Sequence, residues 1–318
     1  MTGAGGFIGS HLTERLVRLG AHTRALIRYT SGGTQGWLDH SSLRADVKII
    51  AGDVRDPRCL SRALDGVEIA FHLAALVGIP YSYIAPHAYL STNTEGTLNI
   101  LEAARCLGTQ RVICTSTSEV YGSALYLPID ENHPLQGQSP YSASKIAADK
   151  LAESYYLSFG VPVTIVRPFN TFGPRQSVRA VIPAIIIQAL AGESVRIGAV
   201  HPTRDFNFVS DIVEGFLAIA TAEGVLGDVI NLGTGLEISV GELASIVEKL
   251  VGKQLILETE EQRLRPPKSE VMRLCADAAK AAHVLGWKPK ITLEEGLLQT
   301  IEWISRNSSV YPARTYSV

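Results

Sequence analysis

The chain has 318 residues, of which 46% are hydrophobic and 19% charged, and its 29 basic and 31 acidic side chains give a formal net charge of −2. This composition is typical of a globular protein with one large domain or two smaller ones. The balanced charge offers no basic surface for nucleic-acid phosphates, and no apolar run approaches the roughly 20 residues of a membrane-spanning helix. We therefore expect neither a nucleic-acid partner nor a membrane span.

The first residues, Met1 to Gly6, contain neither the basic start nor the apolar stretch of a secretory signal, which favours the cytoplasm. The four cysteines have no CxxC spacing, so we expect neither disulfides nor a structural zinc site. The histidines show no ligand spacing either, and metal binding is not indicated.

Apolar runs of strand length alternate with helical patterns through the first half of the chain, which is typical of βαβ units and a parallel sheet. The predicted helices cover residues 7–19, 93–107 and 141–159. The predicted strands cover residues 22–28, 47–50, 67–73, 111–114 and 163–166. This half is therefore predicted to be an α/β domain with a doubly wound parallel sheet of Rossmann-like type.

After Arg167 and Pro168 the alternation loosens, although residues 228–232 look like one more strand that could return to the first sheet. The other patterns predict helices at residues 210–221, 240–251 and 292–305 and a short strand at residues 255–257. We therefore predict one domain over residues 1–168, with a returning strand near residues 228–235, and a smaller, interleaved α/β domain over residues 169–318.

The first strand of the predicted sheet is almost absent. A doubly wound domain normally has a complete central strand before its glycine turn, whereas here the turn begins at Gly3. Losing a strand that is buried on both faces would leave unpaired backbone groups and a cavity, at a cost of many kcal/mol. We therefore expect that this first strand is truncated and that the chain starts several residues too late. Upstream DNA without an in-frame apolar strand would contradict this expectation.

Glycines at positions 3, 6 and 9 stand immediately before the first helical pattern. Glycine lets the backbone turn sharply and approach a pyrophosphate, whose charge is attracted by the N–H groups and the positive dipole at a helix start. The spacing is GxxGxxG, not the GxGxxG of the common dinucleotide fingerprint. We interpret the segment as a dinucleotide-binding turn, with a plain glycine-rich turn as the alternative. Its candidate contacts are Gly3, Gly6, Phe7, Ile8 and Gly9.

The end of the strand at residues 22–28 bears on the choice between NAD and NADP. An acid there suits the ribose 2′-hydroxyl of NAD, whereas an arginine suits the 2′-phosphate of NADP. This chain has Arg28, which slightly favours NADP, and a solvated arginine at a strand end is the alternative. Asp53 could meet the adenine edge or cap the helix that starts near Pro57.

Tyr141 and Lys145 are four residues apart in a helical pattern, so their side chains share one face of the helix. An ammonium group beside a phenol stabilises phenolate, and an oxidised nicotinamide adds positive charge, so both lower a pKa that is about 10 when unperturbed. The pair follows a predicted buried strand that ends in hydroxyls and a carboxylate at residues 115–119. Because ligands bind at the carboxyl ends of strands in such sheets, we predict an active site here.

These motifs together resemble the extended short-chain dehydrogenase/reductases, the NAD-dependent epimerase/dehydratase family, whose members act on nucleotide sugars. The match runs from the glycine turn almost to Arg306, through residues 71–75, 141–145, 167–170, 204–206, 231–235 and 265–266. Three further stretches, residues 78–83, 116–122 and 137–142, resemble nucleotide-sugar 4,6-dehydratases. The nearest group is the N-acetylglucosamine 4,6-dehydratases of legionaminic-acid-type pathways.

The resemblance implies roles at the predicted active site. Tyr141 would deprotonate the sugar 4-hydroxyl while hydride leaves C4 for the nicotinamide, Thr117 would hydrogen-bond the same oxygen, and Lys145 would bond the nicotinamide ribose. Glu119 would then remove the C5 proton and could protonate the departing C6 hydroxyl, before hydride returns to C6. Positioned proton transfer of this kind contributes roughly 10² to 10⁴-fold to a rate. Ser118 stands where many dehydratases carry Asp, which leaves the identity of the acid open.

The resemblance also implies further contacts. Those to the cofactor are Val54, Leu73, Ala74, Ala75 and Thr115. Those to the nucleotide diphosphate are Asn170, Arg204 and Arg265, with Arg175 and Arg273 as weaker candidates, because guanidinium groups can hold phosphate oxygens in a bidentate manner. His72 is expected to support the cofactor pocket and to take no part in the chemistry.

Other functions share parts of this pattern. A 4-epimerase returns hydride to C4 and needs no base at C5, and a UDP-glucuronate decarboxylase loses CO₂ in place of water. An NADP-sensing regulator is the non-enzyme alternative, which the intact catalytic set disfavours. The family's equivalents of the helices at residues 93–107 and 141–159 form a dimer interface, so we predict a homodimer, with packing onto the sheet as the alternative. The small residues on these helices are Ala103, Ala104, Ala143, Ala147, Ala148 and Ala152.

Overall fold

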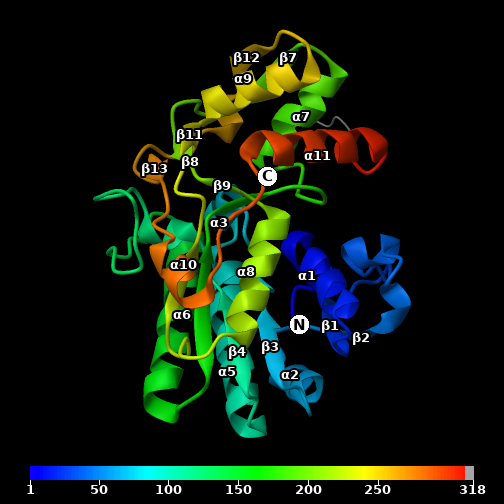
Figure 1. Ribbon diagram of the computed structural model, residues 1–318, viewed down its shortest axis with the longest axis vertical. Helices are drawn as coiled ribbons and strands as arrows, with labels where there is room; N and C mark the ends of the chain where they lie inside the picture. The colour runs from blue at the N-terminus through cyan, green and yellow to red at the C-terminus, as the bar shows by residue number, and fades with distance from the viewer. Residues whose placement is uncertain (312–318) are drawn as a thin grey trace.

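The computed structural model describes residues 1–311, and its centre is a parallel β-sheet with helices on both faces (Figure 1). The strands lie in the order β2-β1 and then β3-β4-β5-β10, and every pair in this order is parallel. Their bounds are Thr23–Arg28 (β1), Val47–Gly52 (β2), Ile69–His72 (β3), Arg111–Thr115 (β4), Val163–Pro168 (β5) and Val229–Leu232 (β10). The doubly wound α/β fold is confirmed, and β10 returns to the first sheet beside β5 as predicted.

Met1 and Thr2 join β1 to β3. The Thr2 backbone forms bridges to Leu26 and His72, and its N–H donates to the Phe71 carbonyl at 2.9 Å. On the other side, the Leu26 N–H donates to the Met1 carbonyl at 2.8 Å. Two residues thus occupy the central place of the sheet, immediately before the turn that begins at Gly3.

Helices α1 and α8 pack together and against the strands on one face of the sheet, and α2, α5 and α6 pack as a layer on the other. Their bounds are Phe7–Arg18 (α1), Pro57–Leu64 (α2), Gly96–Leu107 (α5), Pro140–Phe159 (α6) and Val209–Thr221 (α8). Helix α6 begins at a capping box of Ser139 and Ser142 with proline at the first helical position, and it ends at Gly160 with φ 67°. These signals fix the helix that carries Tyr141 and Lys145.

The remaining elements lie mostly in the second half of the chain, and α7, α9 and α11 with β7 and β12 lie above the parallel strands in Figure 1. The helices are Ile79–Ile84 (α3), Pro86–Tyr89 (α4), Val181–Ala191 (α7), Val240–Val251 (α9), Ala279–Leu285 (α10) and Leu293–Arg306 (α11). Short turns of helix cover Gly36–His40 (η1), Arg44–Asp46 (η2), Leu90–Glu95 (η3), Ser118–Tyr121 (η4) and Glu261–Arg263 (η5). The small sheets pair Asn170–Phe172 (β6) with Phe206–Phe208 (β9), Ser194–Ile197 (β7) with Ile256–Thr259 (β12), and Thr203–Arg204 (β8) with both Ile238–Ser239 (β11) and Arg273–Leu274 (β13).

The sequence pattern missed the helices α3, α4, α7 and α10. Helix α7 was not predicted, because it is apolar on nearly every side and buries residues 182–187, so it lacks the polar face that gives a helix its period. The helix predicted over residues 93–107 is found as α5, and its predicted start lies in a π-helix over Leu90–Glu95 that runs directly into α5. Among residues 1–311, no helix combines the length and apolarity needed to cross a bilayer.

His72 supports Thr2 from the end of β3, and it is 2% exposed. Its Nε2 lies 3.1 Å from the Thr97 hydroxyl, which donates its own proton to the Asn93 carbonyl and so must accept from Nε2–H. The ring Nδ1 is then free to accept from the Thr2 hydroxyl at 2.9 Å. Burial, with the nearby Lys145 charge, lowers the pKa of His72 to about 3, so the ring is neutral at neutral pH.

We predict that acid destabilises the protein through His72. The unfolded chain binds a proton on this side chain below pH 6.5, whereas the folded chain binds one only near pH 3. The contribution is therefore complete above pH 6.5, and between those pH values it falls by about 1.4 kcal/mol per pH unit. Urea unfolding at pH 7, 6 and 5 should show the stability advantage of the wild type over His72→Gln shrinking toward acid pH. A stability difference between the two proteins that stays the same from pH 7 to pH 5 would contradict a neutral, buried His72.

Candidate active site

The glycine turn is formed by close backbone contacts that exclude side chains. Gly3 has φ 68°, and a Cβ on it would lie 2.7 Å from the Ala74 nitrogen. A Cβ on Gly9 would lie 2.0 Å from the Gly3 oxygen. Gly6 is the N-cap of α1, with no side-chain cap and no acid in the first turn, so the leading N–H groups meet no capping side chain of their own helix. Phe7 and Ile8 begin the helix, and the turn fits a pyrophosphate.

Arg28 is the last residue of β1, and Asp53 follows the neighbouring edge strand β2. They line a pocket of about 650 Å³ together with Tyr29, Gly52, Arg55 and Asp56. Asp53 accepts from the Arg55 side chain at 2.6 Å, and burial only partly offsets this bond, so the pKa of Asp53 is lowered. The cap of α2 is Asp56, which accepts from the Arg58 N–H at 2.9 Å, so the capping alternative for Asp53 is wrong.

The remaining predicted cofactor residues lie at the next strand ends. Leu73, Ala74 and Ala75 follow β3, with the first two against Gly3, and Thr115 ends β4. Val54 differs, because its side chain is buried in the core against Gly96 of α5. Two hydroxyl oxygens along this edge, Thr30 Oγ1 and Thr115 Oγ1, are buried with no hydrogen-bond partner in the protein. Buried polar atoms are rarely left unpaired, so this edge fits a polar ligand such as a dinucleotide.

Helix α6 presents Tyr141, Lys145 and Asp149 on one face, because they are spaced by four residues. The Asp149 carboxylate is buried and accepts from Arg167 of β5 at 3.0 and 3.1 Å and from Ser116 at 2.9 Å. This ion pair fixes the helix face against the sheet. The Lys145 ammonium donates to the Thr115 carbonyl at 2.6 Å, at the end of β4.

The pKa of Tyr141 departs from the sequence-based expectation. Lys145 was expected to lower it, whereas burial raises the pKa of the Tyr141 phenol, and the Glu119 charge raises it further. The hydrogen bond between Tyr141 and Thr117 acts in the opposite direction but is outweighed. Burial likewise lowers the pKa of Lys145. In the protein itself the desolvation of both groups outweighs the local charges, and the effect of an oxidised nicotinamide on Tyr141 stays a prediction.

The predicted residues at the end of β4 form the short helix η4. Thr117 is its N-cap, and its hydroxyl accepts from the Glu119 N–H at 3.2 Å. Ser118 is 2% exposed and Glu119 is 8% exposed, so both are buried at the strand end. The Glu119 charge acts on the phenol of Tyr141, which places the two groups in one electrostatic environment. Thr117, Glu119 and Tyr141 are therefore brought together as predicted.

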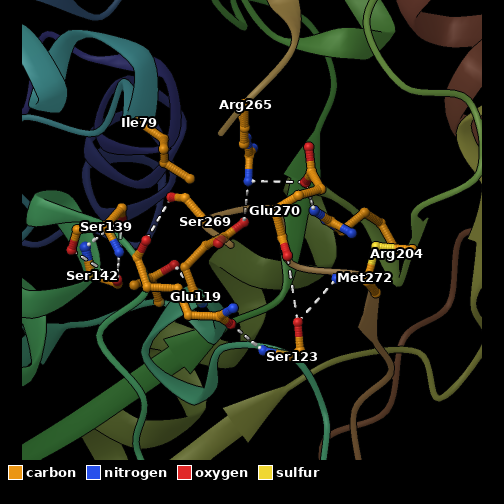
Figure 2. A network of polar contacts seen from close by, with 12 residues as sticks. Ile79, Glu119, Ser123, Ser139, Ser142, Arg204, Arg265, Ser269, Glu270 and Met272 are labelled. Carbon is orange, nitrogen blue, oxygen red and sulfur yellow. Dashed lines mark hydrogen bonds and ion pairs between the residues drawn. The ribbon is translucent and has the colours of Figure 1, made fainter. Parts of the chain in front are cut away.

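Glu119 belongs to a cluster of two carboxylates and two guanidinium groups (Figure 2). Arg265 Nη1 lies 3.7 Å from Glu119 and 3.5 Å from Glu270, and it makes no hydrogen bond. Arg204 Nη2 lies 3.4 Å from the same oxygen of Glu270. Burial lowers the pKa of Arg204, while Glu119 and Glu270 favour its charged form. The cluster joins the proposed catalytic carboxylate to both predicted diphosphate arginines.

The sequence missed Glu270 and the segment around it. The Glu270 carbonyl accepts from Ser123 (Figure 2). Ser269 bonds both Tyr83 of α3 and the Gln138 carbonyl. Residues 265–272 thus run past Glu119 and contact loops from distant parts of the chain. Their spacing in the sequence does not indicate a functional role. Only their position just after Arg265, a predicted phosphate contact, could have drawn attention to them.

The other predicted phosphate contacts divide into two groups. Asn170 begins β6, and its Oδ1 is buried without a hydrogen-bond partner, which fits a ligand contact. The weaker candidates are used elsewhere. Arg175 pairs with Glu14 of α1 at 2.9 Å, and Arg273 pairs with Glu237 on the surface. Neither of these two arginines is part of the Arg204 and Arg265 cluster.

We predict that breaking the Asp149–Arg167 pair destabilises the fold. Arg167→Met leaves the Asp149 carboxylate buried without its cation, which should lower the free energy of unfolding by about 3–5 kcal/mol. Lys150→Ala is the matched control on the same helix, because Lys150 pairs with Glu153 in an exposed position. Its cost should stay below about 1 kcal/mol in the same urea titration. Equal costs for the two variants would show that the buried pair is unimportant.

Comparisons with known proteins agree with this architecture. Residues 1–300 match the sequence model of a family described as GDP-mannose 4,6 dehydratase. A putative UDP-glucose 4-epimerase of Methanocaldococcus jannaschii is 31% identical over 97% of this chain and 98% of its own length. UDP-glucuronic acid decarboxylase 1 of Xenopus tropicalis is 33% identical over 96% of this chain and 72% of its own length.

A solved structure extends the likeness to the whole fold. The dTDP-glucose 4,6-dehydratase DesIV from Streptomyces venezuelae, crystallised with NAD bound, superposes with a TM-score of 0.88 and 28% identity over 97% of each chain. Dehydratases, epimerases and decarboxylases of nucleotide sugars thus all share this chain's full-length pattern. The chain therefore belongs to the NAD-dependent epimerase/dehydratase family of short-chain dehydrogenase/reductases.

Proposed function

We propose that this protein is an NAD(P)-dependent nucleotide-sugar 4,6-dehydratase. The observation that carries the proposal is the buried carboxylate of Glu119, whose charge acts on the Tyr141 phenol and whose ion pair with Arg265 is long, at 3.7 Å. Burying a carboxylate is costly unless its charge is used or compensated. A 4-epimerase has no step that needs a base at C5, whereas a dehydratase does.

Each residue then has a definite task. Tyr141 accepts the proton of the sugar 4-hydroxyl, and Thr117 orients that oxygen through its own hydroxyl. Lys145 holds the nicotinamide ribose and, as a cation, favours the phenolate form of Tyr141. The bound nicotinamide would supply a transient hydride acceptor that oxidises C4 and later reduces C6.

The 4-ketone makes the C5 proton acidic, and Glu119 removes it. With Ser118 in the place of a second acid, Glu119 passes the same proton to the C6 hydroxyl, which leaves as water. The C5 proton and the C6 hydroxyl thus leave the sugar together as water. When hydride has returned to C6, C5 takes up one proton, which balances the proton that Tyr141 took from the 4-hydroxyl, so both side chains return to their starting states. The proposal assigns both proton transfers to one side chain, with Ser118 as a neutral hydrogen-bonding neighbour.

The nucleotide side of the substrate would occupy the second half of the chain. Arg204, Arg265 and Asn170 would bind the diphosphate, since guanidinium groups match phosphate oxygens and the Asn170 side chain has an unpaired oxygen. We assign residues 1–168, with the strand near 228–235, to the cofactor and residues 169–318 to the substrate. The resemblance of residues 78–83, 116–122 and 137–142 supports an N-acetylglucosamine as the sugar.

Homodimer formation and a cytoplasmic location stay predictions. Ala103, Ala104, Ala148 and Ala152 are buried within the single chain, so they serve intramolecular packing. Ala143 is exposed and Ala147 is half-buried, and the exposed Leu157 continues the same face of α6. We propose this smaller face as the dimer contact, and sedimentation that gives a 34.3 kDa monomer at micromolar concentration would reject it.

The assignment of Glu119 predicts the behaviour of Glu119→Gln. With UDP- and GDP-linked glucose, N-acetylglucosamine and mannose, the wild type should give a product that has lost one water, detected by mass spectrometry. Glu119→Gln should lower this rate by roughly 10²-fold or more and still oxidise C4 in part. Glu153→Gln, an exposed position on α6, is the control and should keep the wild-type rate.

Other products would redirect the assignment. Loss of CO₂ from UDP-glucuronate would indicate a decarboxylase, and an unchanged mass with an altered configuration at C4 would indicate an epimerase. Full dehydration by Glu119→Gln would remove the base assignment. No reaction with any nucleotide sugar, combined with tight NADP binding, would favour the regulator.

We propose NADP as the preferred cofactor form, on the basis of Arg28. Its guanidinium is exposed in the pocket at the end of β1, and Thr30 Oγ1 nearby in the chain is buried without a partner. A bond to a charged group is worth about 1.5–3 kcal/mol, so Arg28→Ala should weaken NADP binding by roughly 10- to 100-fold and leave NAD binding nearly unchanged. Calorimetric titration measures both, and Arg58→Ala on the exposed start of α2 is the control. Tighter wild-type binding of NAD than of NADP would contradict the preference.

A further inference from the structure

The glycine turn is held from outside by the segment that follows β1. The Trp37 backbone N–H donates to the Gly5 carbonyl at 3.0 Å. A Cβ on Gly5 would lie 2.3 Å from the Gln35 oxygen, and a Cβ on Gly36, which has φ 65°, would lie 2.3 Å from the Gly5 oxygen. The two backbones therefore touch with no side chain between them. Any displacement of residues 35–37 is transmitted directly to Gly5.

The first part of this segment, residues 29–33, offers little restraint on its own position. A Cβ added to Gly32 or Gly33 would meet no atom within 4 Å, and Tyr29 is 75% exposed. Glycines in open surroundings leave the backbone many conformations. Further along, the Gln35 N–H donates to Asp39 at 2.9 Å, Arg44 donates to the Gln35 side chain, and Leu38 is buried in a cluster with Ala4 and Ala25. The Trp37 side chain adds a contact to a more distant part of the chain.

That contact is aromatic and comes from the other end of the chain. The Trp37 ring lies 5.3 Å from Trp303 of α11 in an edge-to-face arrangement and 6.2 Å from Tyr311 in a stacked one. Trp303 and Tyr311 are themselves edge to face at 5.2 Å. Tyr311 is 4% exposed, and its hydroxyl donates to the Gln176 carbonyl at 2.8 Å. Each ring is therefore fixed by two others, in geometries that aromatic pairs favour.

We propose that Trp37, braced by Trp303 and Tyr311, is a positioning residue for the dinucleotide turn. The brace holds residues 35–37 against Gly5, so that the turn and the first N–H groups of α1 keep one arrangement before the cofactor binds. Preorganisation of this kind raises affinity by removing the cost of ordering the loop. The inference rests on the proposed function, since it requires a dinucleotide at this turn.

The test compares the affinity for the cofactor with the affinity for UDP or GDP, the nucleotide part of the proposed substrate. Trp37→Leu keeps the backbone bond to Gly5 and removes the ring, and Trp303→Leu removes the ring behind it. Isothermal titration with NADP and NAD should give dissociation constants about tenfold higher for both variants, which corresponds to a loss of about 1.4 kcal/mol of binding free energy. Titration with UDP and GDP should give wild-type values within about twofold. Trp37→Phe, which keeps an aromatic ring, should recover most of the cofactor affinity.

Two control variants separate the brace from general stability. Trp287→Phe removes a buried indole whose N–H donates to the Asp211 carbonyl at 2.8 Å, away from the brace, and should lower the melting temperature without changing cofactor affinity. Tyr311→Phe keeps the stacked ring and loses only the bond to Gln176, so its cofactor affinity should stay near that of the wild type.

Three results would overturn the inference. Trp37→Leu and Trp303→Leu could bind the cofactor as tightly as the wild type, or they could lose cofactor and nucleotide affinity equally, which is the mark of a general structural role. In both cases the proposed function stands. A wild-type protein that binds neither NAD nor NADP would overturn the proposed function and the inference together.

Discussion

The buried ion pair between Asp149 and Arg167 determines how α6 lies on the sheet, and the candidate site depends on that orientation. Asp149 follows Lys145 by one helical turn and Tyr141 by two, so fixing its side chain against β5 turns all three toward the strand ends. Arg167 also donates to the Tyr121 hydroxyl at 2.9 Å, and Tyr121 donates to Asn231 at 2.7 Å, which extends the network from β5 to η4 and β10. Burial opposes the charge of Arg167, but Asp149 and Tyr121 outweigh it and raise its pKa. We interpret the pair as a device that specifies one arrangement, since buried ion pairs add little net stability over apolar packing.

The parallel sheet could be predicted because its strands are long enough to show a pattern. Residues 111–115 and 163–168 are nearly continuous apolar runs, as expected of strands covered on both faces. The second half was harder, because β8, β11 and β13 span two residues each and such elements carry no period. They exist because distant segments pair with one another, as Thr203 does with both Ser239 and Arg273. Helix α7 was missed for the opposite reason, since an entirely apolar helix has no polar face to reveal its period.

The candidate site was predictable where its residues are close in sequence. Tyr141 and Lys145 share a helix, and Thr117 and Glu119 share one strand end, so spacing alone places each pair. Glu270 could not be found in this way, because only the folding of a distant loop brings it to Arg204 and Arg265. Arg265 in turn links it to the Glu119 carboxylate. The direction of the Tyr141 pKa was also beyond the sequence. The pKa depends on how completely the phenol is buried, and that burial results from contacts such as the one with the Tyr89 ring, which form only when the chain folds.

The charges around Glu119 explain how one site can hold two arginines before any substrate arrives. Arg204 and Arg265 repel one another, and burial disfavours the charged form of Arg204, so two guanidinium groups alone would be costly here. Glu270 lies within ion-pair distance of both arginines, and Glu119 adds a second negative charge. The four groups therefore have no net charge and keep the guanidinium groups in place. A diphosphate that reached the arginines would compete with the carboxylates for the same cations, and a hydrogen bond from Arg265 to a phosphate oxygen would weaken the attraction of this guanidinium for Glu119. Under the proposed function, substrate binding would be linked to the freedom of the C5 base through one guanidinium group.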